Sequence, residues 1–222
     1  MEMVFEFIKL FIHDMPTALD NLSHAMGPWF YIVLFAIVFC ETGLIVTPFL
    51  PGDSLLFAAG AVCALPGAGL DVVLLGALLM AAALLGDTVN YNVSRWATHK
   101  FVAQGKMPFV KAEHLKRTHE FFEKHGGKTI ILARYLPIIR TYAPFVAGAA
   151  AMPRRKFFGF SVIGAFTWIT LFLGLGFAFG NQPAIRANFK YVILAIIVIS
   201  AAPAVIEFVR SRRPAVNASA EK

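Results

Sequence analysis

The sequence predicts an all-α integral membrane protein, an inverted repeat of two re-entrant helical hairpins plus about three full transmembrane helices and amphipathic surface helices. Hydrophobic residues make up 58% of the 222 residues and charged residues only 15%, whereas soluble domains carry about 25% charged residues. Several apolar runs approach the roughly 20 residues that a helix needs to cross the bilayer. Two of these runs are interrupted by prolines and charges, which a simple span does not need.

The first interrupted run covers residues 29–65. Its acidic and helix-breaking residues are Glu41, Pro48, Pro51, Gly52 and Asp53. Proline removes an amide donor and disrupts a helix interior, and non-helical backbone at membrane depth is tolerated only where protein buries it or it lines a wet cavity. We therefore predict a hairpin with a broken tip near residues 48–53. The alternative is an ordinary span with a proline kink.

A second hairpin is predicted over residues 129–152, where the apolar run is broken again. The interrupting residues are Arg134, Pro137, Arg140, Pro144 and Gly148. Full spans are expected over 70–89, 157–179 and 191–209, the last within a C-terminal transmembrane helix at 189–210. Amphipathic helices are expected over 3–12, within an N-terminal segment 1–24, and over 111–125. The polar tail, residues 211–222, is expected to be disordered.

An internal repeat and the positive charges predict the orientation of these elements. Residues 57–66 resemble residues 145–153, and each half runs from an amphipathic helix through a broken segment to a full span. Short loops rich in Lys and Arg usually face the cytoplasm. The basic stretches 95–128, 154–156 and 210–213 therefore predict a cytoplasmic C-terminus and two hairpins inserted from opposite sides. The N-terminal helix would then lie outside, or in the cytoplasm if the first run spans fully.

Composition also excludes several classes of function. The net charge of +7 does not indicate nucleic-acid binding, because the basic residues cluster in short loops beside apolar segments and no nucleic-acid motif accompanies them. The two cysteines, Cys40 and Cys63, have neither disulfide nor metal-site spacing. The histidines are scattered without ligand partners, so no metal and no cofactor are expected.

Spaced motifs across roughly residues 28–180 resemble the DedA family, the bacterial branch of the VTT-domain (SNARE-associated) membrane proteins. These motifs are Glu41, PGDSLL at 51–56, GD at 86–87 with Tyr91, FFEKHG at 121–126, ARYLPIIR at 133–140, Pro144 and AG at 147–148. The resemblance implies a multi-pass inner-membrane protein of the re-entrant type. It further implies movement of a polyprenyl phosphate (undecaprenyl phosphate) or phospholipid between leaflets, linked to the proton-motive force and supporting envelope homeostasis.

The same resemblance assigns roles to four charges. It implies that Glu41 and Asp53 couple transport to protons and that Arg134 and Arg140 bind the lipid phosphate. Asp87 is expected to be either a helix-end hydrogen-bonding group or a secondary polar site. The prolines and Gly52 named above are expected to shape the site rather than to react.

Physical chemistry supports a site at these charges but leaves an alternative open. A charge at the bilayer centre costs about 2.5–3.5 kcal/mol, so four unpaired charges would cost roughly 10 kcal/mol. Two acids and two arginines sum to zero, and they can pair if the hairpin tips meet. The guanidinium fork matches phosphate oxygens, and only the carboxylates can titrate. In the structural alternative, the four charges are fixed salt bridges that lock the two halves together.

Three functions are therefore compared. A flippase-type transporter of a phosphate-headed lipid is favoured. A membrane enzyme acting on lipid phosphates would need an activated nucleophile or a metal cluster, and the sequence offers neither, so the chain is predicted not to be an enzyme. The third hypothesis is a scaffold protein that transports nothing. The predicted partners are membrane lipids and protons, without nucleic acid, and a homo-oligomer is left open.

Overall fold

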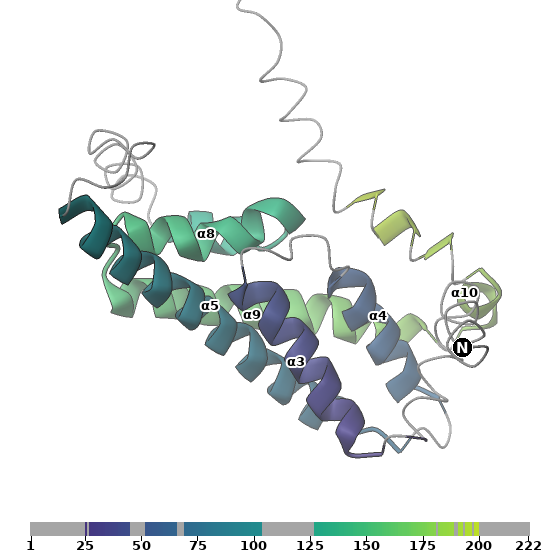
Figure 1. The fold of residues 1–222 in the computed structure, drawn as a ribbon. Coiled ribbons are helices and arrows are strands. Elements are labelled where there is room, and N and C mark those ends of the chain that lie inside the picture. Colours follow the sequence, from purple (N-terminus) through teal and green to yellow (C-terminus); the bar gives the residue numbers. More distant parts are fainter. Residues whose placement is uncertain are drawn as a thin grey trace, which may run out of the picture.

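The computed structural model describes residues 25, 27–44, 52–65, 69–103, 127–180 and 182–188, and the short pieces 191–192, 194–196 and 198–199. Within these residues the secondary structure is entirely helical (Figure 1). The helices are α3 (Trp29–Gly43), α4 (Gly52–Cys63), α5 (Val72–Ala103), α7 (Lys128–Ala133), α8 (Pro137–Ala149), α9 (Arg154–Phe179) and α10 (Pro183–Ala187). The all-α prediction is therefore confirmed for the described part of the chain.

Two of these helices, α5 and α9, are long and apolar enough to cross a membrane. Only 33% of the most apolar stretch of each is buried inside the protein, whereas a core helix of a soluble protein would be mostly buried. Large apolar side chains such as Val73 (77% exposed) and Phe166 (56% exposed) cover their outer faces. Exposed apolar surface of this extent is typical of a protein whose solvent is lipid.

Helix α5 runs further than the span predicted for it. It starts close to the predicted residue 70 but continues to Ala103, into the basic stretch predicted to be a loop. No proline or glycine follows Gly86 in this helix, so the backbone stays helical after the apolar pattern ends. At 1.5 Å per residue its 32 residues reach about 48 Å, more than the roughly 30 Å hydrocarbon core. Its basic end therefore extends beyond the hydrocarbon.

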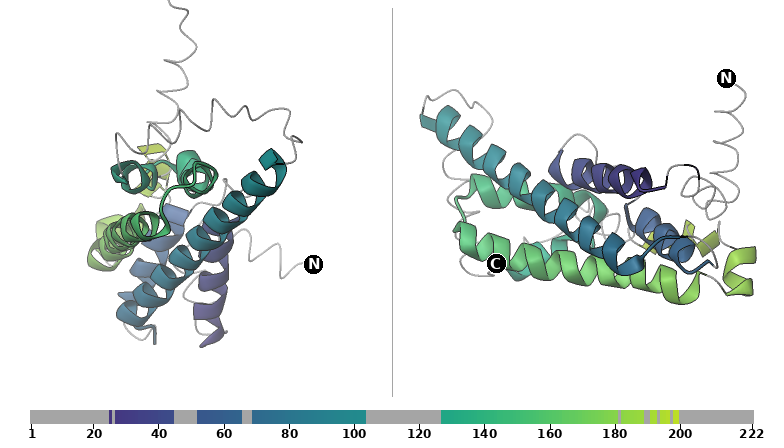
Figure 2. Two further views of the ribbon diagram at one scale, coloured as in Figure 1. Left: turned by 90° about the vertical axis from the view of Figure 1, so that its left-hand side faces the viewer. Right: turned by 90° about the horizontal axis from the view of Figure 1, so that it is seen from below.

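Two pairs of short helices pack across the long ones. Helix α4 packs on α9 and helix α8 on α5, while α3 packs on α5 and α7 on α9 (Figures 1 and 2). Each short pair thus contacts the long helix of both halves. The second pair is broken at Arg134, Tyr135 and Leu136, before Pro137 starts α8, as the proline pattern predicts.

Glycines at matching repeat positions allow two of these close approaches. A Cβ atom on Gly60 of α4 would overlap the backbone carbonyl of Leu173 on α9. A Cβ atom on Gly148 of α8, the counterpart of Gly60 in the repeated motif, would overlap the carbonyl of Tyr91 on α5. Small residues let helix backbones approach closely where the lipid supplies no hydrophobic driving force. The similarity between residues 57–66 and 145–153 therefore reflects a packing requirement shared by the two halves.

A paired substitution on α9 tests this packing. Gly176→Ala would place its Cβ against the backbone of Phe57 on α4, whereas Gly174→Ala meets nothing within 4 Å. We expect Gly176→Ala to destabilise by about 1–3 kcal/mol through overpacking and Gly174→Ala to be neutral or slightly stabilising. Thermal unfolding in detergent, followed by circular dichroism, measures both. Equal effects of the two substitutions would contradict the packing assigned to α4 and α9.

Two apolar cores lie along the long helices, with a polar layer between them. On α5, Leu79 and Ala83 belong to the first core and Tyr91 to the second, and the buried Asp87 lies between. On α9, Phe157 belongs to the second core, the buried Ser161 comes next, and Trp168 belongs to the first core. The polar layer is therefore at the same level on both long helices.

Several predicted elements lie outside the described residues. These are the N-terminal segment 1–24, Pro48 and Pro51 in the first hairpin, helix 111–125, and the tail 211–222. Of the predicted span 191–209, only the short helical pieces before residue 200 are described.

Candidate functional site

The polar layer contains a three-residue ion-pair group centred on Arg140. Arg140 lies in the first turn of α8, Glu41 in the last turn of α3 and Asp53 in the first turn of α4. The Arg140 Nη1 atom donates to Asp53 Oδ1 at 2.8 Å, and Nη2 donates to Glu41 Oε1. All three residues are at most 6% exposed. The two broken segments, far apart in sequence, therefore meet at one guanidinium.

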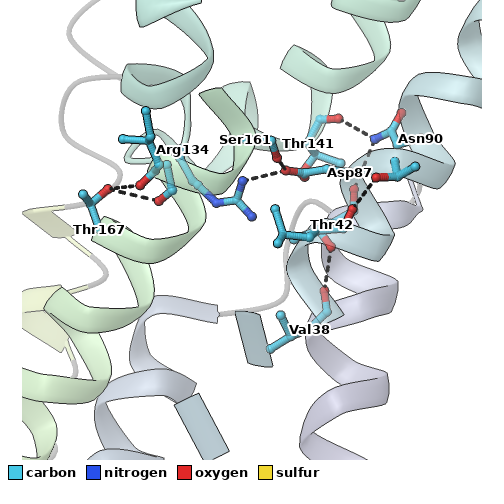
Figure 3. Close-up of polar contacts among 12 residues, drawn as sticks. Val38, Thr42, Asp87, Asn90, Arg134, Thr141, Ser161 and Thr167 are labelled. Carbon is cyan, nitrogen blue, oxygen red and sulfur yellow. Dashed lines mark hydrogen bonds and ion pairs between the residues drawn. The ribbon is translucent and has the colours of Figure 1, made fainter. Parts of the chain in front are cut away.

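A second buried ion pair joins Arg134 to Asp87. Arg134 occupies the turn between α7 and α8, and its Nη1 donates to Asp87 Oδ2 at 2.6 Å (Figure 3). The hydroxyl of Ser161 on α9 donates to the same carboxylate oxygen (Figure 3). Asp87 lies well inside α5, not near its end, so of the two alternatives expected for it the helix-end hydrogen-bonding group is ruled out and the secondary polar site remains. The helix continues past Asp87, which leaves this carboxylate facing the polar layer.

Trp168 on α9 lies against both guanidinium groups. Its indole Nε1 donates to Asp53 Oδ1 at 2.8 Å. The Arg140 Cζ atom lies 4.8 Å from the ring centroid, and the Arg134 Cζ atom lies 5.5 Å from it. Cations within about 6 Å of an aromatic ring are attracted by its quadrupole, more strongly when desolvated. The fully buried ring therefore links the two ion-pair groups.

Asn90 fixes the backbone beside these charges. Its Nδ2 donates to the carbonyl of Thr42 at 3.2 Å and to the carbonyl of Thr141 at 2.9 Å (Figure 3). Thr42 follows Glu41 in the chain and Thr141 follows Arg140. Asn90 therefore holds the end of α3 and the start of α8 together. It thereby also holds Glu41 close to Arg140, its ion-pair partner.

Gly52 and two prolines shape the site without contributing charge. A Cβ atom on Gly52 would overlap the Glu41 carboxylate, so only glycine leaves that carboxylate in place. Pro137 is at the start of α8 and Pro144 lies inside it, buried. A proline at the start fits a helix well, since the first amides have no intrahelical acceptor.

Several polar atoms of the site have no hydrogen-bond partner within the described part of the chain. Among them are Nε and Nη2 of Arg134, Nε of Arg140 and Oε2 of Glu41. Buried polar groups are normally paired. Three donors and one acceptor thus face the interior beside two ion-pair groups, and the donors suit an anionic oxygen. No three His, Cys, Asp or Glu side chains of the described residues are grouped so that they could hold a metal ion.

The structure thus brings together all four charges singled out from the sequence and adds Asp87 to them. The net charge of zero expected for two acids and two arginines does not hold for the group as found. Three carboxylates face two guanidiniums, so the net charge with all groups ionised is negative. Arg140 pairs with Asp53 and with Glu41, and Arg134 pairs with Asp87.

The sequence interpretation missed Asn90, Ser161 and Trp168. A signal for Asn90 was present, because Asp87, Asn90 and Ser94 repeat at helical spacing and so share one face of α5. All three are at most 2% exposed. A single tryptophan or serine in an apolar span carries no such signal.

Comparisons with known proteins identify a matching family and several similar membrane proteins. Residues 50–178 match the VTT domain family. The chain is 46% identical to Protein DedA of Escherichia coli K12 over 219 residues, 99% of this chain and 100% of that protein. It is 37% identical over 185 residues to an uncharacterized membrane protein of Mycobacterium tuberculosis H37Rv, covering 83% and 81% of the two chains. It is 34% identical over 153 residues to the inner membrane protein YqjA of E. coli K12, covering 69% of each. No solved structure matches the chain.

Proposed function

The chain belongs to the DedA family of VTT-domain membrane proteins, and from this premise we propose that it moves a phosphate-headed lipid between the two leaflets of the bacterial inner membrane. The substrate class is undecaprenyl phosphate or a phospholipid, and movement is linked to the proton-motive force. The single observation that carries the proposal is the buried group of two arginines and three acids. Charged residues within transmembrane segments are rare and commonly mark a substrate or ion pathway.

The unpartnered donors of Arg134 support phosphate recognition. One guanidinium nitrogen is used by Asp87, while Nε and Nη2 remain without a partner in the described residues. A guanidinium binds phosphate through two parallel N–H groups, and Nε with Nη2 forms one such fork. A lipid phosphate can therefore bind Arg134 without first displacing Asp87.

The sharing of Arg140 supports proton coupling. Glu41 and Asp53 both pair with this one guanidinium. Protonation of either carboxyl removes one negative charge from the group and weakens the hold on Arg140, which then becomes available to a second anion. With all five groups ionised the site holds one excess negative charge, so a single proton neutralises it. Proton uptake and phosphate binding would thereby favour each other.

The packing of the short helix pairs supports re-entrant hairpins. The breaks within the two pairs bring the charged residues to the same polar layer, between two apolar cores. Transporters often place their sites at the midplane, between inverted repeats with discontinuous helices. In this proposal α3 with α4 and α7 with α8 enter the membrane from opposite sides and meet at the site.

Reconstitution tests the proposal directly. The purified protein is placed in liposomes with labelled polyprenyl phosphate or labelled phospholipid, with and without a proton gradient. We expect the label to change leaflet without chemical change, and faster with the gradient. A new lipid product would instead indicate a membrane enzyme, and neither change would indicate a scaffold.

Arg134→Lys separates phosphate binding from simple charge pairing. Lysine keeps the positive charge and can still pair with Asp87, but it has no planar fork for phosphate. We expect the variant to reach normal membrane abundance and to lose lipid movement at least tenfold, the equivalent of about 1.4 kcal/mol. Transport at the unchanged rate would show that Arg134 acts only through its charge.

Orientation gives a further prediction. The basic stretches 154–156 and 210–213 predict a cytoplasmic C-terminus. A reporter fused after residue 222 should be active if it works only in the cytoplasm and inactive if it works only in the periplasm. The opposite pattern would reverse the orientation proposed for both hairpins.

A further inference from the structure

A groove on the outer surface, separate from the polar layer, lies between α5 and the first turns of α9. Its volume is about 310 Å³. The lining residues are Thr88, Tyr91, Asn92, Arg154, Arg155, Phe157 and Phe158. Its surface is almost wholly apolar, although two arginines border it. The volume is at the lower end of the roughly 300–1,000 Å³ of ligand pockets, so it suits part of an acyl chain rather than a whole lipid.

Two of the lining residues, Tyr91 and Phe157, are held in place by ring stacking and hydrogen bonds. The rings of Tyr91 and Phe157 stack with centroids 4.4 Å apart. The Tyr91 hydroxyl donates to the carbonyl of Met152, and Arg95 donates both to that hydroxyl at 2.5 Å and to that carbonyl at 3.1 Å. These bonds tie the loop before α9 to α5. The groove is therefore a preformed feature of the fold.

The arginines that line the groove differ from the neighbouring Arg95 in having no partner among the described residues. Arg154 and Arg155 are exposed and have no ion-pair or hydrogen-bond partner among the described residues, whereas Arg95 is bound to Met152 and Tyr91. Two exposed arginines thus contribute to the lining of an apolar groove on a membrane protein. Basic pockets between transmembrane helices recognise anionic lipid headgroups.

We propose that this groove binds an anionic phospholipid of the surrounding membrane, with its phosphate on Arg154 and Arg155 and an acyl chain along Phe157 and Phe158. The guanidinium fork matches the phosphate, and the aromatic wall matches the chain. This site lies outside the buried ion-pair groups and does not depend on lipid transport. The bound lipid is a structural ligand of the protein and is not the transported substrate.

Matched single substitutions on α9 test the headgroup contact. The full-length protein is placed in phosphatidylcholine nanodiscs with a minor fraction of phosphatidylglycerol, extracted, and examined by native mass spectrometry for retained lipid. We expect the unmodified protein to retain phosphatidylglycerol in preference to phosphatidylcholine. Arg154→Gln and Arg155→Gln should each reduce this preference about fivefold. Lys156→Gln removes the same charge from an exposed neighbour that does not line the groove, and it should change little.

A second pair tests the acyl-chain contact without altering charge. Phe158 lines the groove and is 51% exposed, while Phe166 on the same helix is 56% exposed and does not line it. Phe158→Ala should lower retention and Phe166→Ala should not, and the exposure of both makes misfolding a minor concern. The proposal is overturned if the protein shows no preference for phosphatidylglycerol. It is equally overturned if Lys156→Gln matches the arginine variants, or if the two phenylalanine variants behave alike.

Discussion

Arg140→Gln is expected to destabilise the protein by about 3–5 kcal/mol, because it leaves the carboxylates of Glu41 and Asp53 buried without their shared cation. The loss should appear as low membrane abundance and as a lower midpoint of thermal unfolding in detergent. Among the ion-pair substitutions this should be the most damaging, since Arg140 serves two acids whereas Arg134 serves one. Arg134→Gln is the matched comparison and should destabilise less.

Removing the acids as well separates stability from function. In the variant with Arg140→Gln, Glu41→Gln and Asp53→Asn, no uncompensated charge remains at this group. Much of the penalty for breaking a buried ion pair comes from the uncompensated charge that is left, so we expect abundance to return towards normal. Lipid movement should stay lost, because the two carboxyls proposed to carry the proton and the guanidinium are all gone. An abundant and active triple variant would mean that these charges only hold the two halves together.

The sequence predicted the contents of this site better than its pairing. Charges inside apolar runs carry a high free-energy cost in a membrane. Because of that cost, Glu41, Asp53, Arg134 and Arg140 could be identified from the sequence. Which arginine meets which acid depends on how the short helix pairs pack against α5 and α9. In the structure Arg140 pairs with both Asp53 and Glu41, whereas Arg134 pairs with Asp87.

Asp87 and Trp168 show two different limits of what a linear sequence pattern can indicate. For Asp87 the sequence left open a helix-end group or a secondary polar site, because the predicted span ends there. Nothing breaks the backbone of α5 at that point, so the helix continues past Asp87. By burial Trp168 is a packing residue of the first core. Its second role depends on the indole N–H and on cations from other helices, and a linear sequence cannot reveal such neighbours.

Trp168→Phe is expected to reduce lipid movement strongly while leaving the fold in place. Phenylalanine keeps an aromatic ring in the core but removes the N–H that donates to Asp53 at 2.8 Å, and a smaller ring offers less surface to both guanidiniums. Loss of one hydrogen bond to a charged group costs about 1.5–3 kcal/mol. Trp168→Ala, by contrast, should cost about 3–5 kcal/mol through the cavity it creates. Trp96→Phe is the control, since Trp96 is 60% exposed and should tolerate the same change.

A double-mutant cycle decides whether Trp168 acts through Asp53. If the indole positions this carboxyl, Trp168→Phe should have a much smaller effect on transport in an Asp53→Asn background, because the effects of substitutions at two residues in contact do not simply add. Unfolding midpoints and rates of lipid movement are measured for the unmodified protein, the two single variants and the double variant. Additive losses in both quantities would mean that Trp168 only fills the core. If the double variant instead loses no more transport than the single variants, and all of the variants remain folded, then Trp168 acts on transport by positioning Asp53. Trp168 would then be the residue that joins the two ion-pair groups into one site.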